Sequence, residues 1–259
     1  MFNYKFKTMK KIFSLMLVIT SILCFTACSG DDEEGPNIPT SHNMKVGEIL
    51  NFKYKSNWAS SNTFVATVDN NGVVTAIRKG DANIYSTDKD LSCYISVSPS
   101  FTLYNDPITD WGSSKSSIIS RKGTPDNETT EDSEDGERTL LSYYPSLTIT
   151  PIEMYIFEDN LLASSAIAVA TSYTEELLEH LSQRSIPVAV DLENFSLYFI
   201  DAETFEDAET IIWAQLFNEN YWLVMYMYTQ NTISRSAVNQ NELFERLKSK
   251  VESIGIIKE

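Results

Sequence analysis

Hydrophobic and polar residues alternate in short runs through the first half of the chain. The runs have the two-residue period of β-strands, and they cover residues 45–54, 64–68, 73–76, 82–86 and 92–98. Gly72 and Gly80 lie in the polar segments between runs, where glycine accepts the positive φ of a tight turn. The pattern predicts an all-β sandwich over residues 40–99.

From residue 101 on, the pattern mixes the periods of helices and strands. Serine caps at Ser114 and Ser172 open two expected helices, the second through a capping box that pairs Ser172 with Glu175. Strands are expected at 137–144, 148–158, 161–170, 186–191, 195–200, 210–217 and 221–228. A helix followed by antiparallel strands thus occurs twice. This order predicts an α+β domain over residues 101–259, with an antiparallel sheet and an internal repeat.

The last segment has the apolar period of an amphipathic helix over residues 239–254. One side of this expected helix carries Leu243, Phe244, Leu247, Val251 and Ile254. Residues 101–259 would therefore close with a helix that can pack on an apolar surface.

The N-terminus has the layout of a secretory leader. Lysines come first, an apolar stretch covers residues 12–25, and the small pair Thr26-Ala27 precedes Cys28. Phe25-Thr26-Ala27-Cys28 resembles the lipobox of bacterial lipoproteins, although leucine is usual at its first position. The resemblance implies a signal peptide at residues 1–27 and acylation of Cys28, hence a membrane contact through lipid. Translation can start at Met1 or at Met9.

The segment after the lipobox is acidic, and residues 28–39 are expected to form a tether. Its small and acidic residues resemble the surface-export signal of lipoproteins in the Bacteroides group; they are Ser29, Asp31, Asp32, Glu33 and Glu34. The resemblance implies an outer-membrane protein held at the cell surface. The alternative is a solvated linker on a protein that faces the periplasm.

Net charge and cysteine content restrict the classes of partner. The formal net charge is −16, and removal of the leader with its four lysines leaves 16 basic against 36 acidic residues, a net charge of −20. Such a surface repels phosphate backbones, so nucleic acid is not an expected partner. Cys93 would be the one thiol of the folded part and is expected in a strand as a buried hydrophobe. A monomer without cofactor is expected.

Several linked motifs in residues 40–99 resemble the group 2 bacterial immunoglobulin-like domain. They are Val46-Gly47-Glu48, Trp58-Ala59-Ser60-Ser61-Asn62, Val65-Ala66-Thr67-Val68-Asp69, Gly72-Val73-Val74-Thr75-Ala76, Lys79-Gly80-Asp81-Ala82-Asn83-Ile84 and Cys93-Tyr94-Ile95-Ser96-Val97. The resemblance implies a β-sandwich of extracellular adhesins and surface enzymes, with no catalytic residues. Trp58 is then expected as the large apolar side chain of the core.

The second half carries a shorter resemblance, to β-lactamase-inhibitor-protein-like modules. It rests on Trp111-Gly112-Ser113, Gly123-Thr124-Pro125 and Phe157-Glu158-Asp159-Asn160-Leu161, over about sixty residues. The resemblance implies an α+β domain whose concave sheet grips a protein partner.

Motifs for catalysis or metal binding are not found in the sequence. His42 and His180 are the two histidines, and a single helical histidine is typical of a surface or half-buried position. Acidic pairs leave glycosidase chemistry open by residue type. Within the acidic run 126–137, the segment Glu131-Asp132-Ser133-Glu134-Asp135-Gly136 resembles a calcium loop, but Ser142 stands where the bidentate glutamate belongs. A solvated loop is therefore expected, and no metal site.

The strand at 221–228 contains the most suggestive residues for binding. Trp222, Tyr226 and Tyr228 share one side of it, and Trp213 on a neighbouring strand could extend the row. The row is either an exposed aromatic platform for a protein or glycan, or a second buried face of the sheet.

Three functions are compatible with these features. The first is a non-catalytic surface lipoprotein, in which the immunoglobulin-like domain is a spacer for a C-terminal recognition domain that binds a protein or a carbohydrate. The second is a small surface carbohydrate-active or other hydrolytic enzyme. The third is a periplasmic envelope-assembly or inhibitor lipoprotein. The identity of the partner is not encoded in any motif of the sequence.

Overall fold

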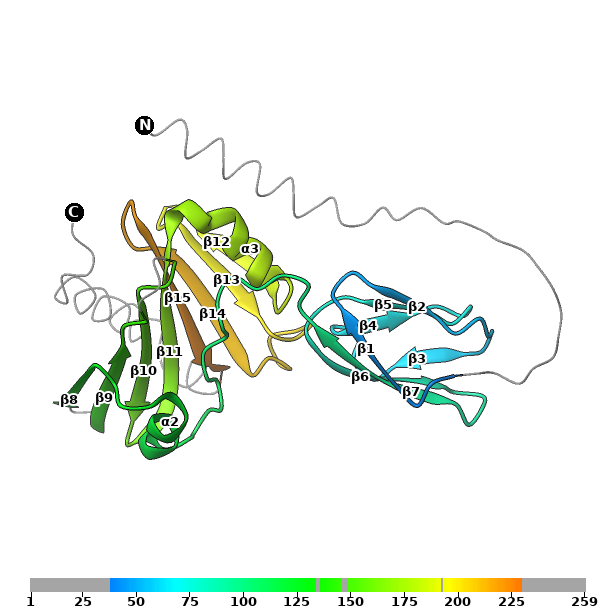
Figure 1. Ribbon diagram of the computed structural model, residues 1–259, viewed down its shortest axis with the longest axis horizontal. Coiled ribbons are helices and arrows are strands. Elements are labelled where there is room, and N and C mark those ends of the chain that lie inside the picture. The colour runs from blue at the N-terminus through cyan, green and yellow to red at the C-terminus, as the bar shows by residue number, and fades with distance from the viewer. Residues whose placement is uncertain (1–37, 134–135, 146–148, 192, 230–259) are drawn as a thin grey trace. The chain divides into compact units, whose positions relative to one another are not determined.

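The computed structural model describes residues 38–133, 136–145, 149–191 and 193–229 (Figure 1). The expected leader, the tether before residue 38 and the expected helix at 239–254 lie outside these residues. In the described part, no helix is long and apolar enough to cross a membrane.

Residues 38–98 form a sandwich of two sheets, which we call the Ig-like unit. One sheet has the order β1 (Ser41–Lys45), β7 (Ser92–Ser98), β6 (Gly80–Ser86) and β3 (Trp58–Ser60). The other has the order β2 (Ile49–Asn51), β5 (Val73–Ala76) and β4 (Ala66–Val68). All pairs are antiparallel except β1 and β7, which run parallel. The all-β prediction for this region is confirmed.

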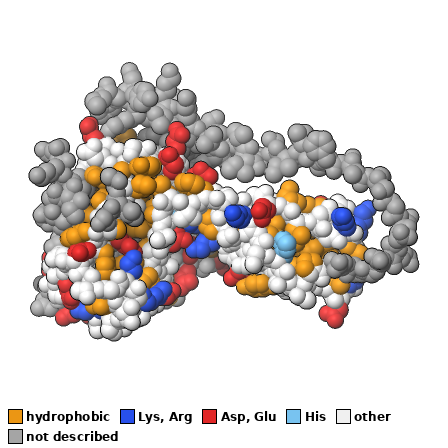
Figure 2. All heavy atoms as spheres, in the orientation of Figure 1, with side chains coloured by type: hydrophobic (Ala, Val, Ile, Leu, Met, Phe, Trp, Pro, Cys, Tyr) orange, Lys and Arg blue, Asp and Glu red, His pale blue; other side chains and the backbone are white. Residues whose placement is uncertain are grey.

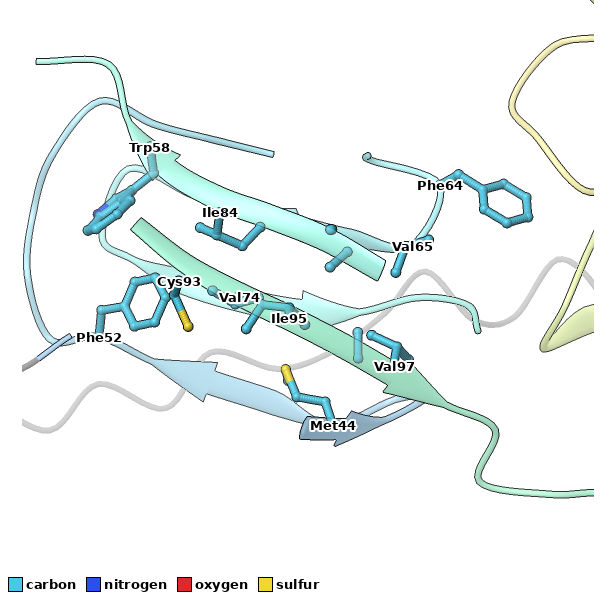
Figure 3. Close-up of a cluster of buried hydrophobic side chains, with 13 residues drawn as sticks. Met44, Phe52, Trp58, Phe64, Val65, Val74, Ile84, Cys93, Ile95 and Val97 are labelled. Atoms are coloured by element: carbon cyan, nitrogen blue, oxygen red, sulfur yellow. The ribbon is translucent and has the colours of Figure 1, made fainter. Parts of the chain in front are cut away.

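The core of the Ig-like unit lies between the two sheets (Figure 3). Trp58 packs against Phe52 with ring centroids 5.0 Å apart, and its indole Nε1 donates to the Tyr54 carbonyl at 2.9 Å. Cys93 is a free thiol with no exposed surface, and burial raises its pKa. Both residues are therefore core residues, as the alternating pattern predicted for Cys93 and as the resemblance to the immunoglobulin-like domain implied for Trp58.

The strand boundaries at the start of the Ig-like unit differ from the prediction. Of the single strand expected at 45–54, only Ile49–Asn51 form a strand, β2, and a turn at Gly47, whose φ is +89°, separates it from β1. Neither β1 nor β3 was predicted. Each is an edge strand with one paired neighbour, and β1 buries only Met44, so its sequence lacks a clear alternation.

The predicted turn glycine Gly72 is required by its surroundings. Its φ is +78°, and a Cβ atom there would lie 2.8 Å from the Tyr54 carbonyl and 3.2 Å from Trp58 Nε1. A side chain at this position would therefore collide with the hydrogen bond that holds Trp58 in the core.

Residues 101–229 contain one eight-stranded antiparallel sheet and two short α-helices, which we call the sheet unit. The strand order is β12 (Ile186–Asp191), β13 (Ser196–Ile200), β14 (Thr210–Leu216), β15 (Tyr221–Tyr228), β11 (Leu161–Ala170), β10 (Ile152–Glu158), β9 (Gly136–Tyr143) and β8 (Asn127–Ser133). The helices are α2 (Lys115–Lys122) and α3 (Thr174–Ser182), the latter preceded by the 3-10 helix η1 (Thr171–Tyr173).

The order of elements in the sheet unit is twofold. α2 is followed by the meander β8 to β11, and α3 is followed by the meander β12 to β15. The last strands of the two meanders, β11 and β15, pair antiparallel at the centre of the sheet, with Ala166 opposite Met225. The helix-and-strands order predicted for a repeat is thus present, with four strands in each half.

The residues predicted to begin and end the first helix do so at α2. Ser114 caps the helix by accepting from the Ser117 amide at 3.2 Å, and Gly123, with a φ of +90°, ends it. The hairpin of β10 and β11 turns at Asp159 and Asn160, both with positive φ, which suits a tight two-residue turn.

Two predictions for the sheet unit were wrong. The capping box at Ser172 is not formed, because residues 171–173 make a 3-10 turn and α3 starts at Thr174 without a side-chain cap on its N-cap residue. Most of the acidic run at 126–137 is strand β8 rather than a loop. β8 is an edge strand with polar residues on both sides, so backbone pairing with β9 forms it without a hydrophobic pattern.

The two helices pack on the same side of the eight-stranded sheet, in front of it in Figure 1. Ile118 of α2 clusters with Tyr155 and Phe157, and the 3-10/α3 segment contacts Trp222 through Thr174. We call this side the helix face and the other side the far face. Cross-strand pairs place Trp213, Met225, Ala166 and Met154 together on the far face.

Candidate functional site

The aromatic row predicted on β15 is buried beneath the helix face. Trp222 is 8% exposed and donates from Nε1 to Thr174 Oγ1 at 2.8 Å. Tyr226 is 5% exposed, and its hydroxyl lies 2.9 Å from the Tyr104 hydroxyl. These contacts fix both side chains inside the domain. Of the two interpretations of the row, the structure supports a buried face, and Trp222 and Tyr226 do not form an exposed platform.

Of the remaining two residues of the predicted row, Tyr228 lies on the same side of β15 as Trp222 and Tyr226, whereas Trp213 does not. Trp213 is buried on the far face, where its ring stacks on Tyr198 with centroids 5.8 Å apart. Tyr228 is half-buried, with its ring 6.2 Å from that of Trp111. Trp222, Tyr226 and Tyr228 therefore lie on the helix face, and Trp213 lies on the far face.

A polar cluster that the sequence did not reveal lies at the C-terminal end of α3. Asp106 Oδ1 accepts from Arg184 Nε at 2.6 Å and lies 3.2 Å from His180 Nε2. Asp106 Oδ2 accepts from Lys79 Nζ at 2.6 Å. One carboxylate thus contacts three basic side chains, two from the sheet unit and one from the Ig-like unit.

His180 is fully buried, contrary to the expectation of a surface or half-buried residue. Its ring packs on Tyr104 with centroids 4.0 Å apart, and its Nδ1 accepts from the Leu103 amide at 3.2 Å. His180 stands three residues after Leu177 and next to Leu181, so it shares the apolar stripe of α3. Helical spacing was the signal that could have placed it in the core.

The same helix end holds the segment that joins the two units. The Gln183 Oε1 atom accepts from the amides of Ser100 and Phe101 at 2.8 and 3.0 Å. Arg184 Nη1 donates to the carbonyl of Phe101, and Nη2 donates to Thr102. The side chains directly after α3 therefore supply partners for backbone groups of a segment without regular secondary structure.

Burial and charge shift the pKa values of this cluster in defined directions. Burial lowers the pKa of His180, and the contact with Asp106 offsets this only in part. Burial alone would raise the pKa of Asp106, but the contacts with His180, Lys79 and Arg184 outweigh it and hold that pKa far below its usual range. Burial raises the pKa of Tyr226 well above its usual value. At neutral pH, His180 is therefore neutral, Asp106 is ionised and the neighbouring Tyr226 is neutral.

This arrangement holds segments of the chain together. Nδ1 of His180 accepts from the Leu103 amide, and Nε2 of the same ring faces Asp106. We call Asp106, His180, Gln183 and Arg184, with Lys79, the junction cluster. Its chemistry is that of a hydrogen-bonded clamp between segments.

The predicted lipid and export residues cannot be placed in this fold. The residues outside the described part of the chain are Cys28, Ser29, Asp31, Asp32, Glu33 and Glu34, and their roles remain predictions from the sequence.

Among the residues that the structure describes, no three His, Cys, Asp or Glu side chains form a group that could hold a metal ion. On the face shown in Figure 2, acidic and basic side chains are interspersed.

Comparison with known proteins identifies the first unit. Residues 38–93 match the bacterial Ig-like domain (group 2), a domain typical of surface proteins. No curated protein matches the chain. Among solved structures, the chain is similar to an extracellular protein containing an SCP domain from Bacillus anthracis str. Ames, at 16% identity and a TM-score of 0.24. That match covers 51% of this chain and 50% of the other, so the chain spans half the length of this relative.

Proposed function

We propose that this chain is a non-catalytic lipoprotein of the outer-membrane surface, in which the Ig-like unit is a spacer and residues 101–259 recognise a protein or glycan. The observation that carries the proposal is the match of residues 38–93 to a bacterial Ig-like domain, a type of domain typical of surface proteins. In this account the acylated Cys28 holds the protein in the membrane, and the acidic segment after it is the tether.

The contacts between the two units support the role of a spacer. Besides the ion pair of Lys79 with Asp106, the Lys79 amide donates to the Gln183 carbonyl at 2.9 Å. Arg78 Nε donates to the Ser185 carbonyl at 3.4 Å, and Ile186 packs against the core of the Ig-like unit. A spacer presents a second domain in a defined direction when polar and apolar contacts join them beyond the linker.

The resemblance of the first half of the sheet unit to β-lactamase-inhibitor-protein-like modules favours a protein as the partner. The resemblance rests on the segments of the capped helix α2, its stop at Gly123 and the hairpin turn at Asp159 and Asn160. That resemblance implies recognition of a protein by the domain. The aromatic row on β15 is not the surface involved, since Trp222 and Tyr226 are buried.

The recognition role is tested by binding screens of residues 29–259 against glycans and against surface proteins. The sheet unit exposes Leu161, Val190 and Phe205, and the Ig-like unit exposes Tyr85 and Tyr94. We expect a detected interaction to weaken with serine at one or more of the first three and to persist with serine at Tyr85 and Tyr94. Phe205 and Tyr94 are a matched pair, being 50% and 48% exposed. Loss of binding only in the tyrosine variants would make the Ig-like unit the binding domain and contradict its role as a spacer.

A further inference from the structure

The far face of the eight-stranded sheet is a continuous apolar surface. Its side chains come from four neighbouring strands. They are Ile152, Met154 and Ile156 of β10, Ala166 and Ala168 of β11, Trp213 of β14 with Phe217 directly after it, and Leu223, Met225 and Met227 of β15. Both described α-helices pack on the opposite side, α2 through Ile118 and α3 through its contacts to Trp222 and Tyr104. No helix described between residues 38 and 229 therefore covers this face.

The side chains of the far face are nevertheless enclosed. Ile152, Met154, Ala166 and Met225 have no exposed surface, and Trp213 is 4% exposed. A bare sheet face would leave side chains of this size in contact with water, at a large cost in free energy. Their burial requires a second layer on the far face.

We propose that the C-terminal segment of the same chain, residues 239–254, is this layer and binds the far face as an amphipathic helix. Its apolar stripe, Leu243, Phe244, Leu247, Val251 and Ile254, matches the composition of the far face, and Glu245, Ser249 and Glu252 fall on the opposite side. The occupant thus has the one-sided polarity that a cover for an apolar sheet needs.

The position and length of the segment fit this role. The chain leaves the sheet from β15, a central strand whose Leu223, Met225 and Met227 lie in the middle of the far face. A helix of about 16 residues is roughly 24 Å long. The four strands that carry the far face, β10, β11, β15 and β14, span roughly 19 Å at about 4.8 Å spacing, so a helix of this length crosses them. A linker of about ten residues reaches up to roughly 33 Å. The segment can therefore reach and cross the face without leaving its own molecule.

Disulfide trapping in the secreted chain tests the proposal directly. The test uses residues 28–259 with Cys28→Ser and Cys93→Ser, so that no native thiol remains. One new cysteine replaces Met154, Ala166 or Met225 on the far face. A second replaces Leu247 or, as the matched control, Ser249. Under mild oxidation we expect at least one sheet position to form a disulfide within the monomer with residue 247, and none to do so efficiently with residue 249.

Two outcomes would overturn the assignment. Equal yields for residues 247 and 249, or no disulfide at all, would remove the segment from the far face. Disulfides found only between molecules would make a second copy of the chain the occupant.

Methionine oxidation provides a second readout in the full chain. Leu247→Asp places a charge in the apolar stripe and should raise the peroxide oxidation rates of Met154, Met225 and Met227 severalfold, while Met44 in the Ig-like core serves as an internal standard. Ser249→Asp should leave all four rates unchanged. Unaltered oxidation of the three far-face methionines in Leu247→Asp would contradict the proposal, whereas faster oxidation of Met44 as well would indicate general unfolding.

Discussion

The two units of this chain bury their sheets in different ways. In β7 of the Ig-like unit, Cys93, Ile95 and Val97 point into the core while Tyr94 between them is 48% exposed. In β15 of the sheet unit, six consecutive residues from Trp222 to Met227 are buried. A sheet with one buried face has an outer surface that tolerates change, whereas a sheet buried on both faces forms the middle layer of its domain.

The largest expected losses of stability come from substitutions in the sheet unit, one on each of its faces. Trp222→Ala on the helix face should lower the free energy of unfolding by about 3–5 kcal/mol, and Leu223→Ala on the far face by about 2–5 kcal/mol, because each leaves a cavity. Urea unfolding of the purified chain measures both values. A loss below about 1 kcal/mol at Leu223 would show that the far face contributes little to stability.

A smaller effect is expected at the junction cluster that joins the units. Asp106→Asn keeps the shape of the side chain but removes the charge that pairs with Lys79 and Arg184. We expect a loss of about 2 kcal/mol in the free energy of unfolding, as for hydrogen bonds to charged groups. The exposed Asp88, which accepts from Ser56 and Ser86 within the Ig-like unit, offers a control, since Asp88→Asn should affect that unit alone. Equal changes in both variants would argue against a role of Asp106 at the junction.

The pH dependence of stability distinguishes the buried histidine from the rest of the chain. The pKa of His180 in the folded protein lies below its ordinary value of 6.5, so the unfolded chain binds this proton more tightly. The free energy of unfolding should therefore fall as pH drops below about 6.5, before the carboxylates with depressed pKa values, such as Asp106, are protonated below about pH 4.

His180→Asn isolates that contribution, because asparagine can still accept from the Leu103 amide but does not titrate. We expect the variant to be less stable than the parent at pH 7.5 and to lack the decline between pH 6.5 and pH 5. Thermal unfolding in a series of buffers checks this. The same decline in the variant would assign it to other groups.

The smallest effect is expected on the outer side of the Ig-like sheet. Tyr94→Ala should change the free energy of unfolding by no more than about 0.5 kcal/mol, since the ring is largely in water. Its neighbour Ile95 has no exposed surface, and Ile95→Ala should cost about 2–5 kcal/mol. A similar loss at both positions would mean that this sheet too is covered on its outer side.

The contrast between the units explains which parts of the structure were predictable. Alternation in β6 and β7 revealed the strands and the buried Cys93, because each has one face in water. In β15 the same alternation separated Trp222 from Leu223 but left open whether the side of Trp222 was exposed or was a second buried face, and the structure buries both sides. The row of aromatic residues was therefore compatible with a platform and with a core.

Local chemistry predicted turns and caps better than it predicted edge strands and long-range contacts. Ser114 and Gly123 bound α2 as expected, because their signals act over a few residues. β8 has no hydrophobic pattern and depends on pairing with β9. The junction cluster joins Lys79, Asp106 and His180, which are distant in sequence, and no spacing of residue types indicates such a contact.

Protease treatment of intact cells tests the proposed function most directly, because a spacer and a recognition domain at the surface must be accessible from outside. We expect peptides from both the Ig-like unit and residues 101–229 to be released into the medium, detected by mass spectrometry, while a periplasmic marker stays intact. Release of these peptides only after the outer membrane is permeabilised would place the protein on the periplasmic side and contradict the account.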